Sequence, residues 1–231
     1  MAIILNIETS TKNCSVSISK DGNCISLFEK KTKNYSHSEN LHVFIKKSLK
    51  EARIKFSNLN AVCVCNGPGS YTGLRIGVSS AKGICYVLNI PLLSIDTLTV
   101  MSKEMNPSSG FLIPMIDANR KEVYTTVFDT FGKMLCPIKA IILNNNSFQE
   151  YSNKKIHLIG DGAFKALNVL KLDFEYHPNI VPSAKNMGEI SERLFHFQQK
   201  KNENILFFEP FYRLSKMDTH NIYSHEKMDD K

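Results

Sequence analysis

A glycine-rich stretch holds the residue types in this sequence that are best suited to chemistry. It runs from Asn66 to Gly77 and reads Asn-Gly-Pro-Gly-Ser-Tyr-Thr-Gly-Leu-Arg-Ile-Gly. Glycines permit positive φ and close approach of another group, and the free N–H groups of a following helix attract anions. Gly67, Gly69 and Ser70 are therefore candidate phosphate ligands. The alternative is a tight strand-to-helix turn, because the stretch lacks the G-x-x-x-x-G-K-[ST] pattern of a P-loop.

Histidines offer metal chemistry, but their spacing does not favour it. His37 and His42 are five residues apart, which turns them about 500° around a helix and off a common face. An H-E-x-x-H pattern is absent, and no Ser, His and Asp order suggests a hydrolase. We therefore predict no metal site, no catalytic residue and no peptidase activity. Asp117, Arg120 and Glu122 could bind a ligand, but a salt-bridge cluster in a hairpin is the favoured interpretation.

Small residues recur every four positions in the helix that follows the glycine-rich stretch. A glycine inside a helix costs about 1 kcal/mol relative to alanine, so the two glycines in this stripe need a compensating close contact. That contact could lie within the same lobe or with another subunit. For the second alternative the candidate interface residues are Gly73, Leu74, Gly77, Ala81 and Ile84.

The elements that must position these residues follow from hydrophobic periodicity. Alternating and continuous apolar runs predict strands, and apolar residues at spacings of three and four predict helices. In the first half we expect strands at 2–8, 14–19, 24–28, 61–65 and 91–95, and helices at 37–52 (capped by Ser36), 72–88 and after Asp96 or Thr97. In the second half we expect strands at 111–116, 122–128, 138–143 and 156–159, and helices at 163–170 and, after Ser183, at 184–199. The order of elements occurs roughly twice, offset by about 110 residues, which is a repeat of architecture without a visible repeat of sequence.

Four segments together resemble the TsaB (YeaZ) family, and the match runs in order across residues 1–213. They are Ile7-Glu8-Thr9-Ser10, the stretch 66–77, Asp117-Ala118-Asn119-Arg120-Lys121-Glu122-Val123-Tyr124 and Pro210-Phe211-Tyr212-Arg213. The resemblance implies an α/β, actin/Hsp70-like (ribonuclease H-like) fold with two lobes of mixed sheets flanked by helices. The expected units are an N-terminal lobe of residues 1–105 with part of 206–214, a smaller lobe of 106–205, and a flexible tail of 215–231.

The resemblance also implies a role without catalysis. Members of the family are dimerisation subunits for TsaD, the transferase that places threonylcarbamoyl on the tRNA adenosine beside the anticodon, and they work with the ATPase TsaE. Glu8-Thr9-Ser10 stands where active relatives place the first phosphate-binding turn, and the aspartate and glycine of a family kinase are missing. We therefore expect no cofactor on this chain alone, ATP being used by the complex. The alternative is a small ATP-dependent phosphotransferase or ATPase.

Composition and charge bear on partners and location. The 231-residue chain has a formal charge of +7, and residues 30–55 hold eight basic and two acidic side chains. This segment is either a solvated helix face or a surface for RNA or an acidic partner. Six cysteines without a C-x-x-C pair predict reduced thiols and a cytoplasmic protein. No apolar run approaches the roughly 20 residues that span a membrane, and the N-terminal run predicts a strand and not a signal peptide. A homodimer is an alternative to the TsaD pairing, and tRNA would be met through the complex.

Overall fold

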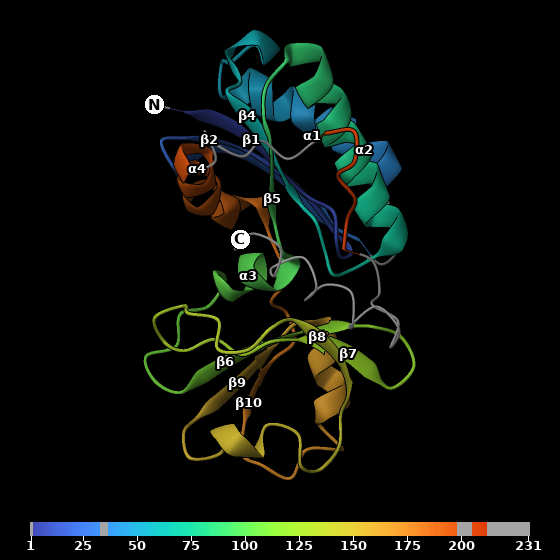
Figure 1. The fold of residues 1–231 in the computed structure, drawn as a ribbon, viewed down its shortest axis with the longest axis vertical. Coiled ribbons are helices and arrows are strands. Elements are labelled where there is room, and N and C mark those ends of the chain that lie inside the picture. Colours follow the sequence, from blue (N-terminus) through green and yellow to red (C-terminus); the bar gives the residue numbers. More distant parts are fainter. Residues whose placement is uncertain (1, 33–36, 198–204, 212–231) are drawn as a thin grey trace, which may run out of the picture.

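Two lobes are stacked along the long axis of the molecule in the computed structural model, which describes residues 2–32, 37–197 and 205–211 (Figure 1). Each lobe contains one five-stranded sheet. The strand orders are β3-β2-β1-β4-β5 and β10-β9-β6-β7-β8, so both sheets have the same topology when the second is read backwards. The predicted two-lobed α/β fold with a repeated architecture is confirmed.

The N-terminal sheet combines an antiparallel meander with two parallel strands. Strand β1 pairs antiparallel with β2, and β4 pairs parallel with β1 and with β5. Its elements are β1 (Ile3–Glu8), β2 (Asn13–Lys20), β3 (Asn23–Lys31), α1 (His37–Glu51), β4 (Ala61–Cys65), α2 (Tyr71–Leu88), β5 (Leu92–Ile95) and α3 (Thr97–Ser102). Every residue of β4 is buried, as expected for a central parallel strand.

Period-two alternation divides this sheet into two apolar faces. Leu5 and Ile7 of β1 pack with the buried side of α1 and α2, while Ile4 belongs to a cluster on the other face. That second face is covered by the 3-10 turn η4 (Ala184–Met187) and by helix α4 (Gly188–Phe197). Figure 1 shows α4 on one side of the sheet and α1 and α2 on the other.

The position of α4 corrects the expected division of the chain. Residues 106–205 were predicted to form the second lobe, but Met187 and Ile190 pack against Ile4 of the N-terminal sheet. The physical reason is burial: without this cover, one apolar face of the first sheet would meet water. Ser183 caps the segment as predicted, its hydroxyl accepting from the Lys185 amide.

Most strands of the C-terminal sheet are shorter than their counterparts in the N-terminal sheet. Its strands are β6 (Phe111–Asp117), β7 (Glu122–Thr125), β8 (Lys139–Ile142), β9 (Ile156–Ile159) and β10 (Glu175–His177). The helix expected at 163–170 is instead the 3-10 segment η3 (Asp161–Ala166), and the strand expected at 122–128 ends at Thr125. Strand β10 was not predicted, since three residues give too short a pattern to be recognised.

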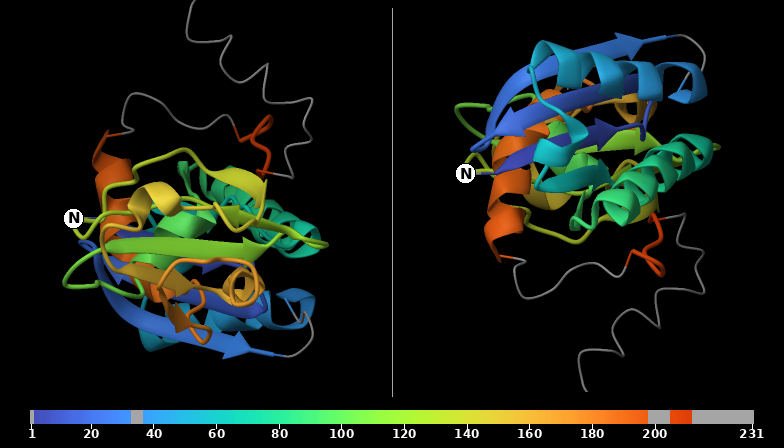
Figure 2. Two further views of the ribbon diagram at one scale, coloured as in Figure 1. Left: turned by 90° about the horizontal axis from the view of Figure 1, so that it is seen from below. Right: turned by 90° about the horizontal axis from the view of Figure 1, so that it is seen from above.

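The last described segment returns to the N-terminal lobe. The Lys82 ammonium of α2 donates to the carbonyls of Leu206 and Phe208 at 3.2 and 3.1 Å, and the Phe211 amide donates to Asn66 O at 2.7 Å. Figure 2 shows residues 205–211, in red, beside α2. The Ser36 cap and the tail of 215–231 lie outside the described residues. Within the described part of the chain, no helix combines the length and the apolar character that a membrane crossing needs.

Candidate functional site

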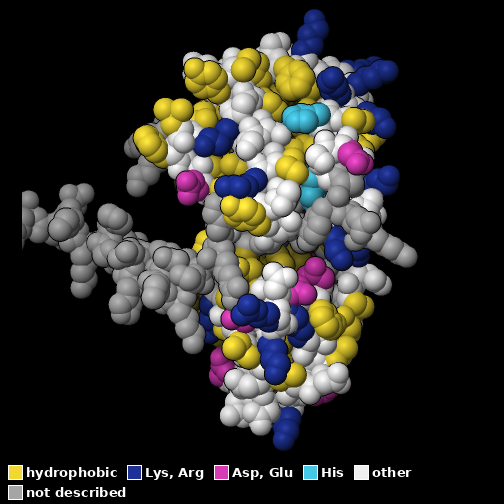
Figure 3. Space-filling model, turned by 90° about the vertical axis from the view of Figure 1, so that its right-hand side faces the viewer, with side chains coloured by type: hydrophobic (Ala, Val, Ile, Leu, Met, Phe, Trp, Pro, Cys, Tyr) yellow, Lys and Arg dark blue, Asp and Glu magenta, His cyan; other side chains and the backbone are white. Residues whose placement is uncertain are grey.

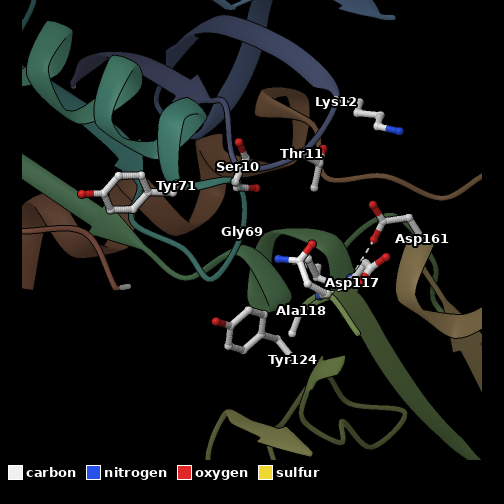
Figure 4. Close-up of a pocket in the computed structure, with 12 residues that line it drawn as sticks. Ser10, Thr11, Lys12, Gly69, Tyr71, Asp117, Ala118, Tyr124 and Asp161 are labelled. Carbon is white, nitrogen blue, oxygen red and sulfur yellow. Dashed lines mark hydrogen bonds between the residues drawn. The ribbon is translucent and has the colours of Figure 1, made fainter. Parts of the chain in front are cut away.

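A cavity of about 600 Å³ lies between the lobes. It opens where β1, β6 and β9 end, which is the edge at which α/β sheets bind ligands. Figure 4 shows its walls, and its lining residues are Ser10, Thr11, Lys12, Gly69, Ser70, Tyr71, Ile116, Asp117, Ala118, Asn119, Tyr124 and Asp161. Its volume falls in the range of small-molecule sites, about 300–1,000 Å³.

The glycine-rich loop forms the upper wall by packing tightly on the turn after β1. Ser70 caps α2, its Oγ accepting from the Gly73 amide at 3.2 Å. The Ser70 amide donates to Ser10 O at 2.7 Å. A Cβ on Gly69 would come within 3.0 Å of Ser10 O, and one on Gly73 within 3.0 Å of Thr9 O. Gly69 and Gly73 are therefore required because the loop packs closely on the turn after β1. The amides of Ser70 and Gly73 already donate hydrogen bonds within the chain.

Gly67 serves a different contact of the same loop. Its φ is +107°, a backbone conformation that residues other than glycine rarely adopt. A Cβ there would come within 3.0 Å of Phe211 O. Its carbonyl accepts from the Thr97 amide at 2.8 Å. Gly67 therefore joins α3 and the returning segment 205–211 to the loop, and it does not line the cavity. Of the three candidate phosphate ligands, only Gly69 and Ser70 face the space between the lobes.

The small-residue stripe of α2 faces the interior of its own lobe. A Cβ on Gly77 would lie within 3.0 Å of Thr9 Oγ1, and that hydroxyl donates to Gly73 O at 2.8 Å. Leu74 and Ala81 are buried as well, and Ile84 packs against the same core. The predicted interface is therefore wrong for Gly73, Leu74, Gly77 and Ala81, which are buried in their own lobe, while for the partly buried Ile84 it stays a prediction. Packing within the lobe, the alternative given by the sequence, accounts for the stripe.

The carboxyl group of Glu8 is enclosed behind the cavity. Its Oε1 accepts from the Ser10 amide at 2.6 Å and from the Ser10 hydroxyl at 2.5 Å. Its Oε2 makes no hydrogen bond of good geometry with the described residues. Burial raises the pKa of Glu8, and hydrogen bonds from the Cys65 thiol and from Ser10 offset this only in part. Glu8 does not line the cavity, so it holds the turn in place and does not offer a carboxylate to a ligand.

The lower wall carries two aspartates whose positions are fixed by the second lobe. The Asp117 amide donates to Asp161 Oδ1 at 3.1 Å, and burial raises the pKa of Asp161. The Lys165 ammonium lies 2.5 Å from Asp117 Oδ1 and donates to Glu122 O at 2.8 Å. Asp117 therefore pairs with Lys165 of η3, which corrects the predicted pairing within the hairpin of Asp117, Arg120 and Glu122.

His37 and His42, the two histidines considered as metal ligands, make different contacts in the structure. His37 Nε2 lies 2.8 Å from Thr11 O, and burial lowers the pKa of His37. His42 Nε2 lies 3.4 Å from Ser80 Oγ on α2. His37 thus supports the turn beside the cavity, while His42 joins α1 to α2.

An exposed apolar surface covers the outer side of α1 and α2. We define the outer face as Val43, Gly83, Tyr86 and Val87, of which Tyr86 and Val87 are 74% and 79% exposed. A Cβ on Gly83 would meet no atom of residues 2–32, 37–197 and 205–211 within 4 Å. Figure 3 shows hydrophobic side chains among lysines on this side of the molecule. The signal that could have found this face is a pair of apolar residues, Tyr86 and Val87, one step out of register with the buried stripe.

Lysines of α1 lie beside this face. Lys46, Lys47 and Lys50 are exposed, as the helical pattern predicted, and the Lys47 ammonium lies 5.9 Å from the centre of the Phe28 ring. Their use in binding RNA or an acidic partner stays a prediction.

Two lobes of like topology around a cleft define the actin/Hsp70-like class of α/β proteins. Comparison with known proteins narrows this class. The family model described as "TsaD: tRNA N6-adenosine threonylcarbamoyltransferase" matches residues 31–208. The "tRNA threonylcarbamoyladenosine biosynthesis protein TsaB" of Buchnera aphidicola subsp. Schizaphis graminum is 30% identical over 215 residues, which cover 89% of this chain and 98% of that protein.

Two further comparisons agree with this relative. The Escherichia coli K12 protein of the same name is 31% identical over 123 residues, 52% of each chain. The structure of "YeaZ from Pseudomonas aeruginosa" superposes with a TM-score of 0.79 at 20% identity, covering 92% of this chain and 100% of that one. The chain belongs to the TsaB (YeaZ) family.

Proposed function

We propose that this chain is a non-catalytic subunit in the synthesis of threonylcarbamoyladenosine in tRNA, and that it binds a TsaD-type transferase through the outer face of α1 and α2. Relatives named as tRNA threonylcarbamoyladenosine biosynthesis proteins support a role in this synthesis. A TsaE-type ATPase would join the same complex, and tRNA would be reached through it. The single observation that carries the choice of surface is Gly83, a helical glycine that no close contact among the described residues explains.

Gly83 differs from the other two glycines of α2 in this respect. Gly73 and Gly77 are compensated by contacts with Thr9, whereas Gly83 leaves an open notch between exposed apolar side chains. Small residues on a helix surface allow another helix to approach closely. Exposed aromatic and aliphatic side chains around such a notch are typical of protein interfaces.

The family match favours a partner of the same fold. A model named for the transferase matches 178 of this chain's residues, 31–208, so the two proteins share an architecture. Related folds can pair through corresponding surfaces around an approximate twofold axis, as identical subunits do. The outer helices of the N-terminal lobe are suited to such pairing because they do not obstruct the cleft of either partner.

Substitution on the outer face tests the proposed interface. We expect Val87→Asp and Gly83→Leu to weaken binding of the purified transferase by about 100-fold or more, since truncating a central interface residue costs about 2–4 kcal/mol. Binding is measured by calorimetry or co-elution with the TsaD-type protein of the same organism. The matched control is Phe131→Asp, which replaces a 92% exposed apolar residue of the C-terminal lobe and should leave binding unchanged. Wild-type affinity in both variants would refute the interface.

The absence of catalysis by this chain is also part of the proposal. The turn Glu8-Thr9-Ser10 is packed against the glycine-rich loop, which leaves little room there for a phosphate. The alternative, an ATP-dependent phosphotransferase, has one observation in its favour, the cavity with Asp117 and Asp161.

Nucleotide titration distinguishes these two functions. We expect the purified chain to show no micromolar binding of ATP with Mg²⁺ by calorimetry and no ADP release. If turnover is found and Asp161→Asn abolishes it while the protein stays folded, the cleft is an active site and the non-catalytic role is refuted.

A further inference from the structure

Three side chains with metal-ligand chemistry meet on one face of the C-terminal sheet, outside the residues that line the cleft. They are His157 of β9 and Glu175 and His177 of β10. In the parallel pairing of these strands, Glu175 lies opposite His157. Because side chains alternate along a strand, Glu175 and His177 share a face, and Tyr176 between them packs into the core on the other side.

The distances between the donor atoms suit a small cation. His157 Nδ1 lies 3.1 Å from Glu175 Oε2, and His177 Nε2 lies 3.7 Å from the same oxygen. All three donor atoms lie within 4.8 Å of one another. A tetrahedral zinc ion with ligands at about 2.0–2.2 Å separates its donor atoms by about 3.4 Å. A small inward movement of His177 would complete this geometry.

The proton positions of His157 give a second, independent argument. Its Nε2 lies 3.2 Å from Ser109 O, and because a carbonyl only accepts, Nε2 must carry the proton of that bond. In the neutral ring Nδ1 is then an acceptor, and it faces a carboxylate, which also only accepts. A backbone carbonyl that fixes the far nitrogen of a histidine is the usual outer-shell arrangement of a metal ligand.

The lone pairs of these two rings are not used by the described residues. His157 is only 5% exposed, and neither its Nδ1 nor the shielded Nε2 of His177 makes a hydrogen bond within residues 2–32, 37–197 and 205–211. The approach of Nδ1 to Oε2 is therefore close without having hydrogen-bond geometry. The ammonium of Lys155 pairs with the other oxygen of Glu175, at 2.5 Å, and this leaves Oε2 directed at the two rings.

We propose that His157, Glu175 and His177 bind one divalent transition-metal ion. Two imidazoles and one carboxylate form a ligand set typical of Zn²⁺, and water would fill the fourth position. Such an ion would tie the three-residue edge strand β10 to β9. The competing occupant is a proton on Nδ1, which would make the cluster an ion pair of His157 with Glu175.

Titration of the full chain with Zn²⁺, after treatment with a chelator, tests this site. We expect one tight equivalent by calorimetry and an increase in Tm on adding the metal. In His177→Gln we expect affinity to fall by at least about 100-fold, since losing even an outer-shell partner costs 10–100-fold. His177 is partly exposed, so this variant should fold. Glu175→Gln, which removes charge at an exposed position, should weaken binding in the same way.

A matched control separates a built site from casual histidine binding. His196 of α4 also faces a glutamate, with its Nε2 2.9 Å from Glu192 Oε1, but it belongs to no three-residue group among the described residues. His196→Gln should bind Zn²⁺ like the wild type. His220 and His225, outside the described residues, are present in every variant and contribute the same background. Equal Zn²⁺ binding by wild type and His177→Gln, or no tight equivalent at all, would overturn the proposal and leave the proton as occupant.

Discussion

Gly77→Leu is expected to lower the free energy of unfolding by about 1–3 kcal/mol. A Cβ at this position would come within 3.0 Å of Thr9 Oγ1, and inserting a larger side chain into a packed core costs about 1–3 kcal/mol. Displacing Thr9 also removes its hydrogen bond to Gly73 O, worth about 1 kcal/mol. The better helix propensity of leucine returns about 1 kcal/mol. Urea unfolding followed by circular dichroism measures the difference.

Gly83→Leu is the matched control in the same helix. It gains the same helix propensity, and no atom of the described part of the chain lies within 4 Å of the new Cβ. Its stability should therefore equal that of the wild type or exceed it by up to about 1 kcal/mol. Comparing the two variants therefore distinguishes two roles of glycine in α2. Gly77 allows close packing inside the lobe, and Gly83 allows close approach of the proposed partner. Equal stability of the two variants would contradict the packing of Gly77 on Thr9.

Glu8→Gln is expected to stabilise the protein at pH 8 by about 1–3 kcal/mol, because it removes a buried charge, whose desolvation costs more than that of a neutral amide. Burial raises the pKa of Glu8 more than the hydrogen bonds from Cys65 and Ser10 lower it, so its charged form is disfavoured in the folded state. Glutamine keeps an oxygen that can accept from the Ser10 amide and removes the charge.

The pH dependence gives the sign of this effect. Between the ordinary pKa of a glutamate and the raised pKa of Glu8, the folded protein holds a proton that the unfolded chain has released. The free energy of unfolding contributed by Glu8 therefore falls as the pH rises through this range. The gain from Glu8→Gln should shrink toward pH 4. Urea midpoints at several pH values measure it, with the exposed Glu150→Gln as control; a gain that is absent at pH 8, or that does not depend on pH, would contradict this account.

The sequence predicted the parts of the fold that rest on long, regular patterns. The continuous run Ala61–Cys65 predicted the central strand, and the three- and four-residue spacing predicted α1 and α2. The family resemblance supplied the two-lobed fold. Short elements such as β10 carry too few residues for a pattern to stand out, and η3 tightens into a 3-10 segment that a helical spacing does not distinguish.

The candidate sites were harder to predict, because they depend on which neighbour fills a space. Gly73 and Gly83 look alike in the sequence, and only the position of Thr9 shows that one is compensated within the chain. His157 and His177 are twenty residues apart, so only the pairing of β9 with β10 brings them together. The pattern Glu175-x-His177 was a usable sign, since residues two apart share a face of a strand.

The cover that α4 gives to the first sheet has a consequence for the order of events during synthesis. A ribosome delivers the whole second lobe before it delivers Met187 and Ile190, which close the far face of β1 and β4. Domains usually fold in the order in which they are translated. Here the earliest strands must wait, with one apolar face open, until nearly two hundred residues have emerged, and this delay makes the nascent first lobe a natural client for chaperones.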